Sequence, residues 1–450
     1  MKIVVIGTGY VGLVSGTCLS GFGYDVTCVD RDASKIERLN RGECPIYEPQ
    51  LEPMIRAHSA SGHLHFTTDP AGVVPWADAV VLAVGTPVTK DTGEIDLSQI
   101  FASVEEIAPL LSDGVVVITK STVMVGTNAR IRNRIAQLRP NLRFSVVSNP
   151  EFLREGSAVQ DFLKADRIVI GAHDDHGRAV TEQLYRPLQM QDTIVKVTSL
   201  EDAEISKYAC NAFLAAKVTF INEIADLCER TGGNVMEVAD IMGMDPRIGD
   251  LFLRAGPGFG GSCFPKDTRA LATFGDAVGA PQGLVKATIA TNEARKRSMA
   301  QRVLKAIGQP TGKQVALFGV AFKPETDDLR ESPALTVVEH LLEAGVGIRG
   351  FDPQAADAAG ALFPQTHWFD DPYDAASGAD AVVIMTEWNV LRALDLMKLK
   401  SAMRTPVMID LRNIHRRKEP ARYGFTYISV GRDVAEPTHA EQSAGLRRKA

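Results

Sequence analysis

Short apolar runs alternate with stretches of helical periodicity along most of the chain. In the N-terminal half these runs occupy residues 2–7, 24–30, 77–84, 114–119 and 144–148. Strands that are apolar on both faces and are separated by helices are typical of a parallel sheet with helices on either side. We therefore expect an open α/β sheet in this half of the chain.

The C-terminal part repeats this organisation. Its apolar runs lie at residues 314–319, 346–352, 379–385, 406–410 and 425–429. The pentapeptide Ala-Asp-Ala-Val-Val stands at both 77–81 and 379–383. A chance match of five residues is the alternative, but the shared order of the runs favours two nucleotide-binding-type domains.

A helical stretch separates the two parts. From about residue 200 to 230, apolar side chains recur at helical spacing, at Ile205, Ala209, Ala212, Phe213, Ala216, Phe220 and Ile224. Gly232 and Gly233 follow and suit a C-terminal cap. The expected fold class is α/β, with two Rossmann-like doubly wound domains joined by a long central helix in a helical middle domain. We place these domains at residues 1–198, 199–305 and 306–434, with a loose polar tail at 435–450.

Composition narrows the class of protein. The 450 residues are 45% hydrophobic and 23% charged, which is typical of globular domains and excludes disorder over most of the chain. A net charge of −6 argues against nucleic acid as a partner. The chain has neither a signal-peptide pattern nor an apolar run near the ~20 residues of a membrane helix. Six dispersed cysteines indicate no zinc site or disulfide framework, so we expect a cytoplasmic protein without a metal or a membrane partner.

The first chemical motif is the turn Gly7-Thr-Gly-Tyr-Val-Gly12, between a predicted strand and a predicted helix. The first glycine allows the tight turn, the second lets backbone approach a pyrophosphate, and the third lets the helix pack on the strand. The N–H groups at the start of the helix would bind the phosphates. Asp30 ends the next strand, where a carboxylate accepts hydrogen bonds from ribose hydroxyls and repels a 2′-phosphate. NAD is therefore favoured over NADP, although Arg31 is adjacent.

Three further segments follow predicted strands. Residues 85–87 and 120–123 lie at strand carboxyl ends, where open α/β sheets bind ligands, and ordinary turns are the alternative. Glu151 and Glu155 would share one face if residues 149–156 are helical, whereas a solvated turn would leave them without a function.

Lys207 and Asn211 are four residues apart on the predicted central helix, so their side chains project from the same face. That face is otherwise small or apolar, where an ammonium and an amide are unusual. They are either a pair that faces the substrate or a lysine that reaches out to water.

The most informative stretch is Gly256-Pro-Gly-Phe-Gly-Gly-Ser-Cys263-Phe-Pro-Lys266-Asp267. Its glycines let the backbone approach a partner closely, and Cys263 follows them directly. Lys266 and oriented N–H groups would stabilise a nucleophilic thiolate, whereas Asp267 would disfavour it. The carboxylate therefore suggests a second role, such as handling a water molecule. A structural cysteine is the alternative.

A dinucleotide site together with a nucleophilic cysteine suggests one chemistry. Removal of a hydride from an alcohol gives an aldehyde, which a thiolate captures as a thiohemiacetal. A second hydride transfer gives a thioester, and hydrolysis of that thioester gives an acid. Lys207 and Asn211 would stabilise the oxyanions of the tetrahedral stages.

The motifs together resemble those of the nucleotide-sugar 6-dehydrogenases, the UDP-glucose/GDP-mannose dehydrogenase family. The resemblance extends from residue 1 to about 432. It rests on Gly7-Thr-Gly-Tyr-Val-Gly-Leu13, Asn149-Pro-Glu-Phe-Leu-Arg-Glu-Gly-Ser-Ala158, Lys207 with Asn211, Gly258-Phe-Gly-Gly-Ser-Cys-Phe-Pro-Lys-Asp267 and Ala321-Phe-Lys-Pro-Glu-Thr-Asp-Asp-Leu-Arg-Glu-Ser332. One departure is Leu411, which stands beside Arg412 where glycine is often found.

The resemblance implies a role for each matching position. NAD contacts are implied at Gly7, Gly9, Tyr10, Val11, Gly12, Asp30, Lys35, Thr86, Thr122, Glu155, Lys266 and Arg330. Cys263 is implied as the nucleophile, and the groups that handle the oxyanions and water are Lys207, Asn211 and Asp267, with Thr122 and Glu151 assisting. Contacts to a UDP-sugar are implied at Glu151, Phe152, Leu153, Arg154, Glu155, Lys207, Asn211, Phe252, Leu253, Arg254, Ala255, Gly256, Gly260, Phe322 and Lys323.

The resemblance also implies an assembly and a division of labour. The central helix would form a homodimer interface, and Arg247 would reach the sugar site of the partner subunit. The second α/β domain would hold the uridine diphosphate, because Gly319-Val-Ala-Phe-Lys323 replaces the second and third glycines of a dinucleotide turn.

Three functions remain open from the sequence. The first is oxidation of UDP-glucose to UDP-glucuronate with two NAD, which Glu-Gly-Ser-Ala at 155–158 favours. The second is the same chemistry on GDP-mannose or a UDP-N-acetyl-hexosamine. The third is a non-catalytic NAD-binding regulator, which is disfavoured because Cys263, Lys207, Asn211 and Asp267 are all present.

Overall fold

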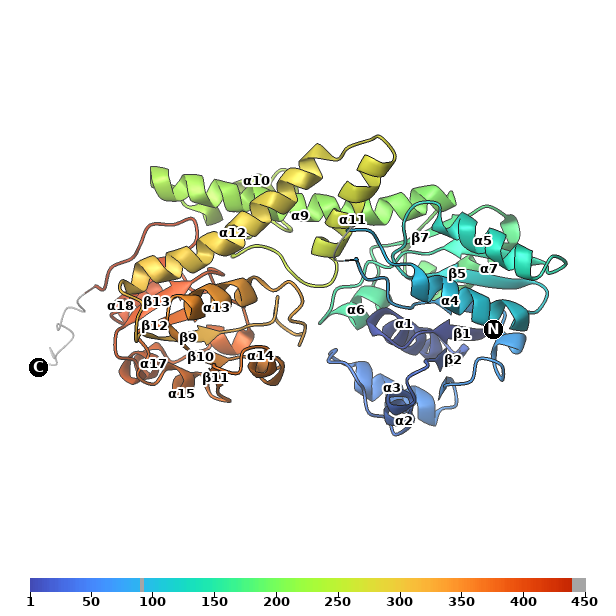
Figure 1. Cartoon of the computed structure of the whole chain (residues 1–450), viewed down its shortest axis with the longest axis horizontal. Helices are drawn as coiled ribbons and strands as arrows, with labels where there is room; N and C mark the ends of the chain where they lie inside the picture. Colours follow the sequence, from blue (N-terminus) through green and yellow to red (C-terminus); the bar gives the residue numbers. More distant parts are fainter. Residues whose placement is uncertain (90–92, 439–450) are drawn as a thin grey trace, which may run out of the picture. The chain divides into compact units, whose positions relative to one another are not determined.

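The computed structural model describes residues 1–89 and 93–438 (Figure 1). The chain divides into two compact units. The first contains Met1–Asn211 and Arg269–Pro281, and the second contains Ala212–Thr268 and the residues from Gln282 onward. Two helices, α9 (Leu200–Thr231) and α11 (Phe264–Ala277), each contribute residues to both units.

The first unit is built on an eight-stranded sheet in the order β3-β2-β1-β4-β5-β6-β7-β8. Its neighbouring strands run parallel, except for the antiparallel pair β6 and β7. The strands are β1 (Lys2–Ile6), β2 (Asp25–Val29), β3 (Leu64–Thr67), β4 (Ala79–Leu82), β5 (Val115–Thr119), β6 (Phe144–Ser148), β7 (Arg167–Ala172) and β8 (Ile194–Thr198).

Helices cover both faces of this sheet because the central strands are apolar on both faces. Ile3 and Val5 pack in one core with α1, whereas Val4 and Ile6 pack in a second core with α4 and α5. The helices of this unit are α1 (Tyr10–Gly21), α2 (Ala33–Asn40), α3 (Leu51–Ala60), α4 (Ser98–Ile107), α5 (Thr127–Leu138), α6 (Ala158–Leu163), α7 (Asp175–Leu184) and α8 (Arg186–Gln189), with short 3-10 turns η1 (Val74–Trp76) and η2 (Ala108–Leu110).

The second unit contains a six-stranded parallel sheet in the order β11-β10-β9-β12-β13-β14. These strands are β9 (Gln314–Phe318), β10 (Gly347–Phe351), β11 (His367–Trp368), β12 (Ala381–Ile384), β13 (Val407–Asp410) and β14 (Thr426–Ser429). The helices are α10 (Val235–Gly243), α12 (Gly283–Ile307), α13 (Pro333–Glu343), α14 (Ala356–Leu362), α15 (Pro372–Ala376), α16 (Asn389–Arg392), α17 (Leu396–Ala402) and α18 (Glu419–Arg422). One apolar core joins this sheet to α9, α10, α12 and α13.

The repeated pentapeptide has the same position in both sheets. Asp78 precedes β4 and accepts a hydrogen bond from Lys2 N at 2.7 Å, and Asp380 precedes β12 and accepts one from Gln314 N at 2.9 Å. In each case the carboxylate binds the first amide of the strand that pairs with its own strand. The two sheets therefore share a detailed construction as well as an order of strands, and the expected fold class is confirmed.

Helix α9 matches the predicted central helix and is followed by Gly232 with φ +76°. Strands β3, β7, β8 and β11 were not among the predicted runs. The domain limits at 198, 305 and 434 stay predictions. Ala435 still pairs with Tyr427, and the predicted tail from residue 439 onward lies outside the described residues.

Asp380 provides a test of this construction. Burial raises its pKa, but the hydrogen bond from Gln314 and the charges of Lys313 and Arg404 outweigh burial, so the pKa is lowered overall. Asp380→Asn should therefore destabilise the fold by about 1–3 kcal/mol at pH 7, measured by thermal unfolding. The difference from wild type should shrink as the pH falls below about 4, because a lowered carboxylate pKa stabilises only while the group is ionised.

Asp78→Asn is the matched control. Asp78 makes the corresponding hydrogen bond at an exposed position. Its substitution should cost less than 1 kcal/mol, as expected for about one solvated hydrogen bond. Equal losses for the two variants would contradict the importance of burial at Asp380.

Candidate active site

The glycine-rich turn after β1 leaves room where a dinucleotide needs it. Gly7 has φ +98°, and a Cβ atom there would lie 2.8 Å from Ala83 O. A Cβ atom on Gly12 would lie 2.0 Å from Gly7 O, so the protein itself requires both glycines. A Cβ atom on Gly9 would meet no protein atom within 4 Å, and Gly9 precedes the first residue of α1. This open position at a helix N-terminus fits an approaching pyrophosphate.

Asp30 lies beside this turn. Its Oδ2 accepts hydrogen bonds from Thr8 N (2.9 Å), Thr8 Oγ1 (2.7 Å) and Lys35 Nζ (3.2 Å). Its Oδ1 accepts one from Asp32 N at 3.0 Å. Burial raises the pKa of Asp30, but these hydrogen bonds and the charge of Lys35 outweigh it and lower the pKa overall. Asp30 is thus a fixed anion beside the glycine-rich turn, and its contact with a ribose stays a prediction.

The equivalent turn of the second sheet is built differently. Gly319 retains a positive φ of +84°, but the following Val320 and Ala321 are buried. Their amides donate to Asp352 Oδ2 at 2.7 and 3.0 Å, and the Trp388 indole donates to the same oxygen. Asp352 is only 4% exposed. Its carboxylate is therefore used within the protein and does not present itself to a ribose.

Lys207 and Glu151 form a buried ion pair within the first unit. Lys207 Nζ donates to Glu151 O at 2.6 Å and lies 3.1 Å from Glu151 Oε1, with the Phe152 ring 5.2 Å away. The side chains are 4% and 6% exposed. Asn211, one turn further along α9, is also buried. The lysine therefore does not extend to water. A lysine that extends to water was the alternative to a pair of Lys207 and Asn211 that faces the substrate.

The segment that carries Glu151 is not helical. Residues 151–154 form neither helix nor strand, and α6 begins only at Ala158, so Glu151 and Glu155 do not share a helix face as they would in a helical segment. Gly156 N instead donates to Tyr10 OH at 2.8 Å, which joins this segment to the glycine-rich turn. Arg154 is exposed and pairs with Asp161 at 2.6 Å.

The other strand-end segments surround a buried lysine. Lys120 Nζ donates to Asn149 Oδ1 (3.1 Å) and to Tyr185 OH (2.9 Å), so it links the end of β5 to the end of β6. Ser121 Oγ donates to Val84 O at 2.7 Å. Thr86 is buried, whereas Thr122 is partly exposed. Cofactor contacts at Thr86 and Thr122 stay predictions.

In the second unit, Cys263 stands immediately before α11. The thiol is partly exposed, and Ser262 Oγ lies 3.6 Å from its sulfur. A helix N-terminus favours the thiolate over the thiol. Asp267 lies in the first turn of this helix, is 1% exposed and accepts a hydrogen bond from Lys266 Nζ at 2.6 Å. The sequence placed Lys266 as a cation for the thiolate, but here its charge also offsets that of Asp267.

Close backbone approaches shape the loop before Cys263. A Cβ atom on Gly260 would lie 2.3 Å from Glu331 O, and one on Gly261 would lie 2.7 Å from the Phe322 ring. Gly261 N donates to Arg330 O at 2.8 Å. The structure thus brings the predicted positions Gly260, Phe322 and Arg330 together.

A basic cavity of about 370 Å³ lies beside the same loop and is lined by Arg254, Ala255, Glu387, Arg392 and Arg412. Arg412 donates to Phe322 O at 2.9 Å and to Met385 O at 2.8 Å. Leu411 is fully buried, so a leucine is accommodated beside Arg412. The sequence assigned no ligand contact to Arg392 or Arg412, because isolated arginines carry no spacing signal.

Three predicted positions have short-range or surface contacts. Arg247 is 87% exposed in its side chain and pairs with Asp245 at 2.5 Å. Arg330 pairs with Asp328 at 2.8 Å, and Lys323 Nζ lies 5.5 Å from the Phe322 ring.

Across residues 1–89 and 93–438, no helix has the length and apolar character needed to cross a membrane.

Comparison with known families assigns most of both sheets and of the helices between them to the domains of one family. The N-terminal 189 residues match the NAD binding domain of the UDP-glucose/GDP-mannose dehydrogenase family, residues 201–294 match its central domain, and residues 316–417 match its UDP binding domain. A UDP-glucose 6-dehydrogenase of Rhizobium meliloti is 50% identical over 96% of this chain and 100% of its own length.

The chain belongs to the UDP-glucose/GDP-mannose dehydrogenase family. Solved structures of the family agree with this result. A UDP-glucose dehydrogenase from Pyrobaculum islandicum superposes with a TM-score of 0.87 at 36% identity, over 95% of this chain and 96% of that one. A UDP-D-ManNAc dehydrogenase from Pyrococcus horikoshii superposes with a TM-score of 0.84 at 27% identity, over 96% of this chain and 99% of that one.

For this dehydrogenase the cofactor prediction is confirmed, because the glycine-rich turn and Asp30 lie in the family's NAD binding domain. The UDP binding domain contains Phe322, Lys323, Arg330, Arg392 and Arg412. Asp352 also lies in the UDP binding domain, where a carboxylate is not needed for the ribose of NAD. This agrees with the use of Asp352 in hydrogen bonds within the protein. The roles of the individual site residues stay predictions.

Asp30 offers a test of cofactor selection. Asp30→Asn keeps the size of the side chain but removes the charge that attracts ribose hydroxyls and repels a 2′-phosphate. NAD affinity should fall by about tenfold to a hundredfold, the loss expected for hydrogen bonds to a charged group, and the ratio of NADP to NAD affinity should rise. Titration calorimetry with both dinucleotides measures this. Asp25→Asn, at the exposed start of the same strand, is the control. An unchanged affinity ratio would refute the role of Asp30.

Proposed function

We propose that this protein oxidises UDP-glucose at C6 to UDP-glucuronate, in a four-electron reaction that uses two NAD. The observation that carries the proposal is Cys263 at the start of α11, with the buried Asp267 one turn away, in a chain 50% identical over 96% of its length to a UDP-glucose 6-dehydrogenase. A thiol is needed for an oxidation that continues past the aldehyde, because covalent capture prevents loss of that intermediate.

In the first oxidation, the sugar alcohol loses a proton and its C6 hydride and becomes an aldehyde. Bound NAD accepts the hydride in each of the two oxidations. The Glu151 carboxylate and carbonyl hold the Lys207 amino group in a fixed place, which suits it to stabilise an oxyanion. Asn211 would donate to the same oxygen, while Asp267, through a water molecule, or Thr122 would take the proton.

In the second oxidation, the Cys263 thiolate adds to the aldehyde carbon and forms a thiohemiacetal, whose oxygen carries the former carbonyl electrons. Loss of the remaining C6 hydride gives a thioester on Cys263. Water then adds to the thioester and the carbon–sulfur bond breaks. This step regenerates the Cys263 thiolate and releases UDP-glucuronate as a carboxylate. Asp267 would orient that water, since its carboxylate is buried in the first turn of the helix that follows the nucleophile.

We assign the nucleotide sugar to the loop from Phe252 to Gly256, to Gly260 and to Phe322 with Lys323, and its diphosphate to the basic cavity with Arg254, Arg392 and Arg412. Guanidinium groups suit this task because they bind phosphate oxygens through paired hydrogen bonds. Glu151 to Glu155 would complete the sugar contacts. The NAD contacts that we propose are those that the family resemblance implies, from Gly7 to Arg330.

We also propose a homodimer through α9 that works in the cytoplasm. Phe213, Phe220 and Leu227 are spaced by seven residues on one face of α9 and are 64%, 49% and 56% exposed. A row of exposed large apolar side chains on one helix is typical of an interface. Arg247, with its exposed side chain, would reach the site of the partner subunit. Each of the six cysteines carries a thiol and not a disulfide, as is usual in a reducing compartment.

The central test counts NADH. With limiting UDP-glucose and excess NAD, the wild-type protein should form two NADH per sugar and release the acid. Cys263→Ser should lose sustained turnover to the acid, because its hydroxyl is a weaker nucleophile and leaves poorly. Lys207→Ala should keep the ratio of two but turn over about 10²–10³-fold more slowly, as expected when one oxyanion donor is lost.

One NADH per sugar in the wild type would mean that the aldehyde is released, and the covalent role of Cys263 would be wrong. No NADH from UDP-glucose, but two from GDP-mannose or a UDP-N-acetyl-hexosamine, would move the proposal to that sugar. The similarity to a UDP-D-ManNAc dehydrogenase structure makes this panel necessary.

The dimer has its own test. Phe220→Glu should place a charge in the apolar row and convert the dimer to a monomer, with sedimentation velocity as the measurement. Val390→Glu changes an exposed apolar residue on α16 in the same way and should leave the dimer intact. A Phe220→Glu protein that remains dimeric would exclude this face of α9.

A further inference from the structure

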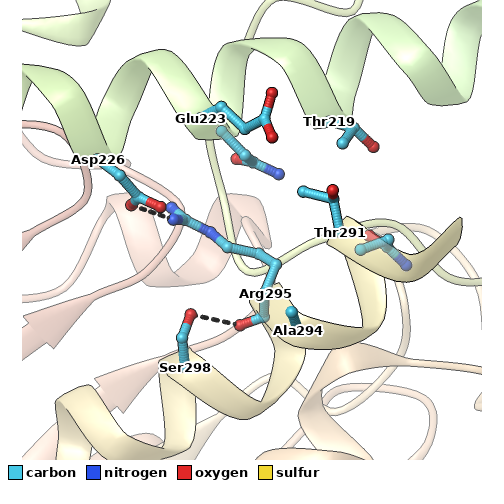
Figure 2. Close-up of a pocket in the computed structure, with 9 residues that line it drawn as sticks. Thr219, Glu223, Asp226, Thr291, Ala294, Arg295 and Ser298 are labelled. Carbon is cyan, nitrogen blue, oxygen red and sulfur yellow. Dashed lines mark hydrogen bonds and ion pairs between the residues drawn. The ribbon is translucent and has the colours of Figure 1, made fainter. Parts of the chain in front are cut away.

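A polar cavity lies within the helical packing of the second unit. It has a volume of about 220 Å³ between α9 and α12, and its lining is Thr219, Asn222, Glu223, Asp226, Thr291, Asn292, Ala294, Arg295 and Ser298 (Figure 2). Nearly all of these side chains are polar, although the two helices also contribute to the large apolar core of the unit. The buried members of this lining are Thr219, Asn222, Asn292 and Arg295. Buried polar groups cost free energy unless they are hydrogen-bonded, so the partners of these side chains indicate their role.

Three of these side chains bind the backbone of one loop. Asn222 Oδ1 accepts a hydrogen bond from Gly256 N at 2.8 Å, and Arg295 Nε donates to Gly256 O at 3.0 Å. Asn292 Oδ1 accepts from Phe259 N at 2.9 Å, and its Nδ2 donates to Phe259 O at 3.1 Å. Asn222, Asn292 and Arg295 are 3%, 2% and 4% exposed. Both backbone groups of Gly256 and of Phe259 are thus satisfied by side chains from α9 and α12.

The loop they bind is the one that leads to Cys263. Residues 253–260 form no helix or strand, so the loop has no ladder of its own to fix its course. Gly258 has φ +116°, and a Cβ atom on it would lie 2.8 Å from Asn292 Oδ1. The asparagine therefore occupies the space that this glycine leaves, and the loop conformation and the side chain fit each other.

Arg295 is itself held in place. Its guanidinium forms an ion pair with Asp226 of α9, as the dashed line in Figure 2 shows. Burial lowers the pKa of Arg295, and the carboxylate of Asp226 acts against that effect. One guanidinium thus joins α9, α12 and the loop, which gives the loop two rigid helices as its support.

We propose that Asn222, Asn292 and Arg295 are positioning residues for the reaction. By fixing the backbone at Gly256 and Phe259, they determine the positions of the proposed sugar contacts at residues 252–256 and of Cys263. They bind the backbone of the loop and act through it. This inference rests on the proposed function of the loop, and small displacements of reacting groups can cost about 10²-fold in rate.

The first arm of the test reads the loop without using activity. Asn292→Ala removes both hydrogen bonds to Phe259, and Arg295→Lys keeps a cation for Asp226 while losing the donor to Gly256. Ser298→Ala is the matched control, because Ser298 lines the same cavity but donates to Arg295 O. Amide hydrogen exchange of the peptide that contains residues 256–263 should be at least about tenfold faster in the first two variants than in the wild type and in the control.

The second arm reads the chemistry. At a temperature where every variant is folded, Asn292→Ala and Arg295→Lys should lower kcat by about tenfold to a hundredfold and raise the KM for UDP-glucose. They should also change the rate at which iodoacetamide alkylates Cys263, followed by mass spectrometry. The NAD dissociation constant should stay within about twofold of wild type, because the dinucleotide turn belongs to the other unit.

The outcomes separate this inference from the proposed function. A wild-type protein that is inactive on every sugar in the panel would remove the proposed function, while exchange and alkylation still report whether the loop is held. Unchanged exchange and alkylation in folded Asn292→Ala and Arg295→Lys would overturn the positioning role. So would a loss of activity that merely follows the melting temperature and disappears on cooling.

Discussion

Parallel pairing of the first strand with a strand far along the chain is the constraint on which both sheets depend. In the first unit β1 pairs with β4, and in the second β9 pairs with β12, so the strand order reverses at these pairs. The loops that leave the carboxyl ends at such a reversal diverge to opposite faces, and ligands bind there. Gly7 and Ala83, which approach each other closely, mark this place in the first unit. Gly319 and Thr386 mark it in the second.

The two sheets show how one scaffold is adapted to different ligands. Asp30 and Asp352 follow equivalent strands, yet the first is a fixed anion beside an open turn and the second is buried against Val320, Ala321 and Trp388. In the second turn Ala321 stands where the first has Gly9, and its amide and the Trp388 indole both donate to Asp352 Oδ2. The two carboxylates thus differ in their local surroundings, although both follow the strand that pairs with the first strand of its sheet.

The sequence predicts most of the framework because the central strands are buried on both faces and therefore read as apolar runs. It does not reveal β8, a five-residue strand at the edge of the sheet in which Ile194 is 67% exposed. Glu151 and Glu155 would share a face only in a helical segment, but residues 151–154, which follow Pro150, form neither helix nor strand. The partners of Lys207, Asn222 and Arg295 lie about 30 to 70 residues away, and no local pattern encodes such contacts. Chemistry-bearing motifs are thus readable from sequence, whereas the side chains that hold them in place are not.

The two units are not consecutive in the chain, and this affects how the protein is made. Residues 269–281 return to the first unit after the chain has entered the second, and Ala270 packs there with Ile95 and Tyr208. When only the N-terminal sheet has been synthesised, residues 269–281 of the first unit are therefore still missing. Completion of the NAD-binding part must wait for the cysteine loop to be synthesised, so a truncated N-terminal fragment leaves apolar surface uncovered. Gene fusions or splits that treat the family's three segments as separate modules would cut through this dependence.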